Sequence, residues 1–128
     1  MGRTQNRVKV SVVDDDESVR YAIVRLLQSA GIVAHGFASA EAFLEADISA
    51  EDSCLVADIR LPGMSGVDLK EEMDKRGKAM PVIFITGYDE EGMRRRARMP
   101  GVVGYFRKPV DAQALLDAIA FAHNSKFG

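Results

Sequence analysis

The sequence predicts an α/β fold in which a five-stranded parallel sheet is covered by helices on both faces. Short, unbroken apolar runs rich in β-branched and aromatic residues recur along the 128 residues. Such runs are typical of strands that are buried on both faces. Segments with apolar residues at helical spacing separate the runs, and this alternation is the order of a parallel sheet with crossover helices.

Five segments are predicted as strands. Four are continuous apolar runs, and the segment 32–37 is added as the second strand. The predicted strands are 8–13, 32–37, 54–59, 82–86 and 102–106.

The first helix is predicted directly after Asp16. Glu17 favours a helix N-terminus, and Gly31 stands where a C-terminal cap belongs. The apolar members recur at three- and four-residue steps: Val19, Ala22, Ile23, Leu26, Leu27 and Ala30.

Capping residues also mark the second and third helices. Ser39 caps a short helix. Ser65 begins a longer helix with Asp68 as its capping partner, and Gly77 ends it. The apolar members are Ala42, Phe43 and Ala46 in the second helix, and Val67, Leu69 and Met73 in the third.

The fourth helix, predicted over 90–99, has the weakest pattern. Gly92 lies inside it, and Pro100 and Gly101 end it. Its four arginines leave Met93 and Ala97 as core positions, so we expect it to be the least stable helix.

The fifth helix is predicted to start after Asp111, which is a good N-cap. Its predicted buried residues are Leu115, Leu116, Ile119, Phe121 and Ala122. We expect one domain over 7–123, with flexible ends at 1–6 and 124–128.

The composition bears on the partners and the cellular setting that we expect. The 17 Lys and Arg residues nearly balance the 19 Asp and Glu residues, so there is no general electrostatic reason to expect nucleic acid or a membrane as partner. No apolar run approaches the roughly 18 residues of a spanning helix. The single cysteine, Cys54, favours a reducing, cytoplasmic setting.

Polar side chains follow four of the predicted strands. Asp14 and Asp15 end the first, Asp58 the third, Thr86 the fourth and Lys108 the fifth. Ligands of an open parallel sheet bind beyond the carboxyl ends of its strands, near the point where strand order reverses. We therefore expect all five side chains to converge on one edge of the sheet.

This set of side chains favours a metal and phosphoryl site. Crowded carboxylates repel one another unless a cation neutralises them. Mg²⁺ typically takes one or two protein carboxylates, which predicts Asp15 and Asp58 as direct ligands and Asp14 as a ligand through water. A carboxylate can attack phosphorus to give an aspartyl phosphate, with Lys108 neutralising charge and Thr86 donating a hydrogen bond.

Four motifs at these strand ends resemble the receiver domain of two-component response regulators. They are VVDD at 12–15, Asp58 followed by LPGMSG at 61–66, ITG at 85–87 and KP at 108–109. The resemblance covers residues 8 to about 120, and it rests on the order and separation of the four motifs together.

The resemblance implies a flavodoxin-like sheet of order 2-1-3-4-5 and a phosphoryl-accepting switch rather than a metabolic enzyme. A phosphohistidine on a sensor histidine kinase would phosphorylate Asp58. Lys108 would precede a cis Lys-Pro bond. The resemblance further implies Mg²⁺ held by Asp14, Asp15, Asp58 and the backbone carbonyl of Arg60, with Thr86 and Tyr105 as the switch pair.

Several alternatives stay open. The acidic triplet 14–16 could be only a solubilising turn, and Tyr105 an ordinary strand aromatic. The chain could be the input half of a DNA-binding transcriptional regulator, a scaffold that no longer accepts a phosphoryl group, or a hydrolase with an aspartate nucleophile. Such a hydrolase would normally carry a second acid where Arg60 stands.

The arginines of the fourth helix could suggest nucleic-acid binding. A charge run on a helix is usually a solvated face, so we expect no direct nucleic-acid contact and favour a surface that docks a partner. That partner is a downstream protein or a C-terminal output domain, and a phosphorylation-dependent homodimer is a further alternative. The arginines are Arg94, Arg95, Arg96 and Arg98.

Two places depart from the family pattern. Arg60 and Tyr88 occupy positions that border the site in receivers, and their bulk predicts slow hydrolysis of an aspartyl phosphate. The segment 99–103, MPGVV, replaces an expected stretch of small residues, so the placement of the fourth helix could differ.

Overall fold

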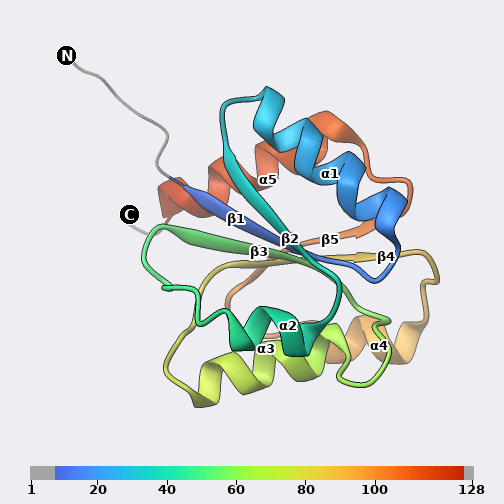
Figure 1. Cartoon of the computed structure of the whole chain (residues 1–128). Helices are drawn as coiled ribbons and strands as arrows, with labels where there is room; N and C mark the ends of the chain where they lie inside the picture. The colour runs from blue at the N-terminus through green and yellow to red at the C-terminus, as the bar shows by residue number, and fades with distance from the viewer. Residues whose placement is uncertain (1–7, 126–128) are drawn as a thin grey trace.

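The computed structural model describes residues 8–125 as a three-layered α/β domain (Figure 1). Its five strands form one parallel sheet in the order β2-β1-β3-β4-β5, which confirms the predicted flavodoxin-like order. Each predicted strand end lies within one residue of the observed one. The strands are β1 (Lys9–Val13), β2 (Val33–Phe37), β3 (Ser53–Asp58), β4 (Val82–Thr86) and β5 (Val102–Arg107).

Helices cover both faces of the sheet, with α1 and α5 on one side and α2, α3 and α4 on the other (Figure 1). Neighbouring residues of a strand enter different layers of the core. Val12 packs in the cluster that contains Leu27 and Leu115, whereas Val13 packs with Phe43 and Leu69. The helices are α1 (Glu17–Ser29), α2 (Ala40–Glu45), α3 (Gly66–Lys75), α4 (Glu91–Arg96) and α5 (Ala112–Ser125).

Side-chain caps set where the helices begin. The Asp16 carboxylate accepts the N–H groups of Ser18 and Val19 at 2.9 and 3.2 Å, and the Asp111 carboxylate accepts that of Ala114 at 2.9 Å. Gly31, with φ +83°, follows the C-cap of α1 as predicted. The short connection 14–16 between β1 and α1 therefore holds its acidic residues at the edge of the sheet.

The length predicted for the fourth helix was wrong. The helix ends at Arg96, and its N-cap Glu90 makes no side-chain cap bond within the described structure. None of its six residues, all described, is buried, whereas Ala97 just beyond it is buried. Gly92 lowers the helix propensity, and the arginines, although fair helix formers, offer no apolar contact that would extend the helix.

The burial predicted for Phe121 was also wrong, since 62% of this residue is exposed. The buried face of α5 takes Leu115, Ile119 and Ala122, which are spaced by four and three residues. At about 100° per residue, a side chain two positions after Ile119 lies on the opposite side of the helix.

The ends of the chain are described only in part. Of the predicted flexible ends 1–6 and 124–128, residues 1–6 and 126–128 lie outside the described residues, whereas residues 124 and 125 belong to α5. Among the helices within residues 8–125, none has both the length and the apolar composition to cross a membrane.

Candidate functional site

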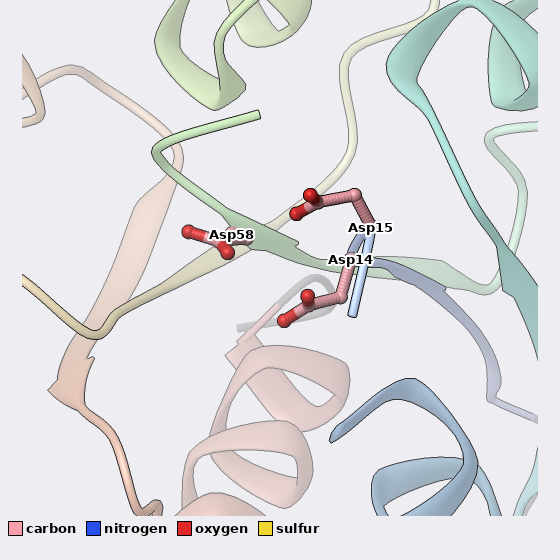
Figure 2. A group of neighbouring side chains, drawn as sticks. All are labelled: Asp14, Asp15 and Asp58. Atoms are coloured by element: carbon pink, nitrogen blue, oxygen red, sulfur yellow. The ribbon is translucent and has the colours of Figure 1, made fainter. Parts of the chain in front are cut away.

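Three carboxylates meet at the carboxyl edge of the sheet. Asp14 and Asp15 follow β1, Asp58 ends β3, and one oxygen of each lies within 4.8 Å of the others. Figure 2 shows the side chains of these two neighbouring strands pointing toward one shared space. β1 and β3 pair directly, with Val13 opposite Ala57, and this register places the two acidic ends side by side.

The carboxylates differ in burial. Asp14 is 0% exposed and Asp58 is 5% exposed, whereas Asp15 is open to solvent. One Asp14 oxygen, Oδ1, accepts the N–H of Asp16 at 2.9 Å, and the Asp14 backbone carbonyl accepts from the Arg20 guanidinium at 2.7 Å. The other oxygen, Oδ2, is buried and has no hydrogen-bond partner among the described residues.

Lys108 brings a positive charge to the same place. Its Nζ donates to Asp58 Oδ2 at 2.9 Å and lies 2.9 Å from Asp14 Oδ2. The second contact lacks hydrogen-bond geometry, so it is an electrostatic attraction only. The Lys108–Pro109 peptide bond is cis.

The ionisation of Asp14 and Lys108 reflects this crowding. Burial raises the pKa of the Asp14 carboxyl, and repulsion from Asp58 adds to that, although Lys108 and the Asp16 N–H oppose it. Burial alone would lower the pKa of Lys108, but its hydrogen bond to Asp58 and its attraction to both Asp58 and Asp14 outweigh burial and raise it. The pocket thus holds a charged ammonium and still has one poorly compensated carboxylate.

The carboxylate of Asp58 is held by both oxygens. Oδ1 accepts the backbone N–H of Arg60 at 2.9 Å, and Oδ2 accepts from Lys108. The loop after Asp58 is closed by Gly66, whose N–H donates to the Ile59 carbonyl at 2.9 Å. A Cβ at Gly66 would lie 2.6 Å from the Asp58 carbonyl oxygen, so only glycine permits α3 to begin this close to the end of β3.

The side chain of Arg60 lies at the rim of the pocket. Its guanidinium carbon is 5.0 Å from the centre of the Tyr88 ring, and its NH1 is 3.0 Å from Glu90 Oε1. These three residues join the loop after β3 to the loop after β4. Arg60 and Tyr88 were predicted from the sequence to border the site. Glu90 was not, because it lies 30 residues from its partner and so has no local signal.

Thr86 and Tyr105 are both tied to the loop 87–90. The buried Thr86 hydroxyl donates to the Tyr88 carbonyl at 2.8 Å and accepts the Tyr88 N–H at 3.1 Å. The half-buried Tyr105 donates its hydroxyl to Asp89 Oδ1 at 3.2 Å. Arg94 pairs with the same Asp89 carboxylate, so this loop connects the acidic pocket to the surface of α4 and β5.

The same contacts shift the pKa values around Tyr105. Hydrogen bonding to Arg94 lowers the pKa of Asp89, burial opposes this, and the bond from Tyr105 adds to the lowering. Burial raises the pKa of Tyr105, and the neighbouring Asp89 raises it further. The tyrosine therefore remains a neutral donor to a charged carboxylate.

The doubly wound sheet, the acidic pocket and Lys108 at the carboxyl edge are arranged as the resemblance to receiver domains implies. The response regulator receiver domain family matches residues 10–120, so this chain belongs to that family, and the resemblance found in its motifs is confirmed. Receiver domains of response regulators are signalling domains and not classical enzymes.

Two curated relatives are about twice as long as this chain. The transcriptional regulatory protein TdiR of Thauera aromatica is 38% identical over 117 residues, covering 91% of this chain and 52% of TdiR. Nodulation protein W of Bradyrhizobium diazoefficiens is 40% identical over 123 residues, covering 94% of this chain and 54% of that protein. The chain thus spans about half the length of these relatives.

Two solved structures share the fold over 94% and 96% of their lengths. The crystal structure of FixJ-N superposes with a TM-score of 0.82 at 34% identity, covering 91% of this chain and 94% of the other. A receiver domain from Clostridium thermocellum gives a TM-score of 0.85 at 30% identity, covering 93% and 96%.

Proposed function

We propose that this chain is the phosphoryl-accepting switch of a two-component system and is phosphorylated on Asp58 by a sensor histidine kinase. The observation that supports this most is the setting of Asp58. Its two oxygens are bonded to the Arg60 N–H and to Lys108, and two further carboxylates lie within 4.8 Å. Membership of the receiver family supports phosphoryl transfer as the class of reaction.

The proposal includes Mg²⁺ held by Asp14, Asp15, Asp58 and the backbone carbonyl of Arg60. The residues fit such an ion, because the buried Asp14 Oδ2 has no hydrogen bond within the described part of the chain and the pKa of Asp14 is raised. When bound, the ion would supply positive charge to the phosphoryl oxygens.

The transfer itself needs little from the protein beyond position and charge. A carboxylate oxygen of Asp58 attacks phosphorus, the new O–P bond forms as the N–P bond of the kinase phosphohistidine breaks, and the imidazole leaves with the electron pair. Lys108 would balance charge on the phosphoryl oxygens. Thr86 would donate its hydroxyl to one of them, giving up its bond to the Tyr88 carbonyl.

The signal would leave through the surface near Tyr105. If Thr86 turns toward the phosphoryl group, the loop 87–90 loses two bonds at Tyr88, and the hold of Asp89 on Tyr105 weakens with it. Tyr105 would then move inward. This is a two-state element that phosphorylation biases.

The output partner is a downstream protein or a C-terminal output domain. Relatives named as transcriptional regulatory proteins are about twice as long as the matched region, which favours the input half of a DNA-binding regulator as the second candidate. In either case we propose no direct nucleic-acid contact by this domain, a cytoplasmic location, and a homodimer formed on phosphorylation as one route of output. A hydrolase is disfavoured, since Arg60 stands in place of a second acid.

Incubation with Mg²⁺ and acetyl phosphate, followed by intact mass, tests the proposal. We expect a gain of one phosphoryl group in the wild-type chain and none in Asp58→Asn. Chelation of the ion should also prevent the gain. No gain in the wild type, while a known receiver gains the group in the same mixture, would overturn the assignment.

A further inference from the structure

We propose that Arg60 is a second cation for the phosphoryl group on Asp58, and that Glu90 holds its side chain away until that group arrives. This rests on the function proposed above and adds a regulatory element to the same site. Lys108 is then paired with Asp58 before and after phosphorylation, whereas Arg60 is paired with Glu90 until the phosphoryl group is present.

The backbone of Arg60 already lies at the acceptor. Its N–H donates to Asp58 Oδ1 at 2.9 Å, so the side chain starts at the mouth of the pocket. The side chain nevertheless points to the opposite loop, where NH1 is 3.0 Å from Glu90 Oε1. A change of side-chain rotamer, with no movement of the backbone, would exchange one anionic partner for the other.

The bond that holds Arg60 at the rim is weak. Its side chain is 49% exposed and that of Glu90 is 45% exposed, so water screens the pair. The pair between Lys70 and Asp74 is different, because the Lys70 side chain is only 3% exposed and donates to both carboxylate oxygens. Arg60 is thus paired in a way that a stronger anion can break.

A phosphoryl group is such an anion. It carries roughly −1.5 to −2 charges, and the planar guanidinium matches its oxygens with two parallel donors. The wall of the pocket around Asp58 is also less exposed to water than the rim, because Asp58 is 5% exposed, and lower exposure strengthens the new pair.

The stack on Tyr88 links this exchange to the threonine. The Tyr88 backbone is bonded in both directions to the Thr86 hydroxyl, and its ring supports the Arg60 guanidinium. When Thr86 turns toward the phosphoryl group, the support under Arg60 loosens at the same time. Both movements then deliver a donor to the same group.

Four variants test the exchange: Glu90→Gln, Arg60→Met, their double variant and the control Glu91→Gln. The control removes an equal charge one position along the chain, where Glu91 pairs with Arg95 at 3.2 Å and both side chains are largely exposed. The measurements are the rate of phosphoryl gain from acetyl phosphate and the rate of loss after the donor is removed.

Glu90→Gln is expected to lengthen the phosphoryl lifetime by about two- to fivefold, the ratio that a weak surface pair can contribute. Glu91→Gln should leave it unchanged. Arg60→Met, which keeps most of the bulk but not the charge, should shorten the lifetime, and Glu90→Gln should have no further effect in that background.

Equal effects of Glu90→Gln and Glu91→Gln would overturn the exchange, since they would show only a general charge effect. It is also overturned if Glu90→Gln acts fully in the Arg60→Met background, or if Arg60→Met retains the wild-type lifetime, which would leave bulk alone as the cause. In each case the wild type still gains a phosphoryl group at Asp58. Failure of that gain would instead remove the proposed function and this inference with it. Thermal unfolding of each variant checks that it is folded.

Discussion

Helices α3 and α4 cover the same face of the sheet, yet they are held in opposite ways (Figure 1). α3 has a complete capping box between Ser65 and Asp68 and buries five of its residues. α4 has no side-chain cap within the described structure and buries none of its six. Each follows a strand that ends in a site residue, Asp58 before α3 and Thr86 before α4.

This difference in burial and capping suits α3 and α4 to different roles in the domain. α3 is anchored in the core and fixes the loop that holds Asp58, so the Asp58 carboxylate keeps its geometry. α4 buries none of its residues, and the pair between Arg95 and Glu91 joins two largely exposed side chains, so it contributes little. Regions of low local stability are the ones that move in switching proteins, so α4 and the loop before it are suited to respond.

The largest expected contrast comes from truncating one apolar residue in each helix. Leu69→Ala in α3 should lower the free energy of unfolding by about 3 kcal/mol, because Leu69 is fully buried and a cavity remains. Met93→Ala in α4 should cost less than about 1 kcal/mol, because Met93 is only partly buried. Urea unfolding measures both, and similar losses would contradict the contrast.

Gly66→Ala tests how closely α3 must approach Asp58. The added Cβ would meet the Asp58 carbonyl oxygen at 2.6 Å and the Ile59 Cα at 3.0 Å, both on the backbone. We expect a loss of about 1–3 kcal/mol and a slower phosphoryl gain, because Asp58 must shift. Unchanged transfer from acetyl phosphate would show that the approach is not needed for the acceptor geometry.

Ser65→Ala removes the cap that α3 has and α4 lacks. The Ser65 hydroxyl accepts the Asp68 N–H at 3.1 Å, and its loss should cost about 1 kcal/mol. Ser65→Asp, which can accept the same bond, serves as the control. The two thermal midpoints should differ; if they coincide, the cap does not stabilise α3.

Gly92→Ala should have the smallest effect and the opposite sign to Gly66→Ala. Within the described part of the chain, nothing lies within 4 Å of a Cβ at Gly92, and alanine favours a helix. We expect a gain of about 0.5–1 kcal/mol, seen as slower hydrogen exchange in α4. Faster exchange would mean that α4 is limited by something other than its glycine.

The sequence predicted the sheet well because its signals are local. The length and β-branched content of unbroken runs such as 82–86 favour buried strands, and the rule for parallel sheets then placed Asp14, Asp58 and Lys108 at one edge. The caps Asp16, Ser65 and Asp111 likewise act within three residues of themselves. The structure places Asp14, Asp58 and Lys108 at this edge as predicted, whereas their chemical roles stay predictions.

Two kinds of feature could not be predicted from the sequence. The first is contacts between residues far apart in the chain, and the second is a helix end that depends on small, opposing contributions to helix stability. The contact of Arg60 with Glu90 spans 30 residues, and that of Tyr105 with Asp89 spans 16, so no pattern within a helix or strand marks them. The end of α4 was misjudged because an arginine-rich segment has fair helix propensity but no buried face to extend it.

The unsatisfied oxygen of Asp14 has a consequence for how this domain can change over generations. A buried carboxylate with an incomplete set of partners works against folding, so selection for stability alone would replace it with a smaller or neutral side chain. Its retention would mark a trade-off in which ligand binding outweighs thermal robustness. A library of variants of this chain sorted only for heat resistance should therefore lose Asp14 early and become enriched in well-folded domains that lack the proposed phosphoryl transfer.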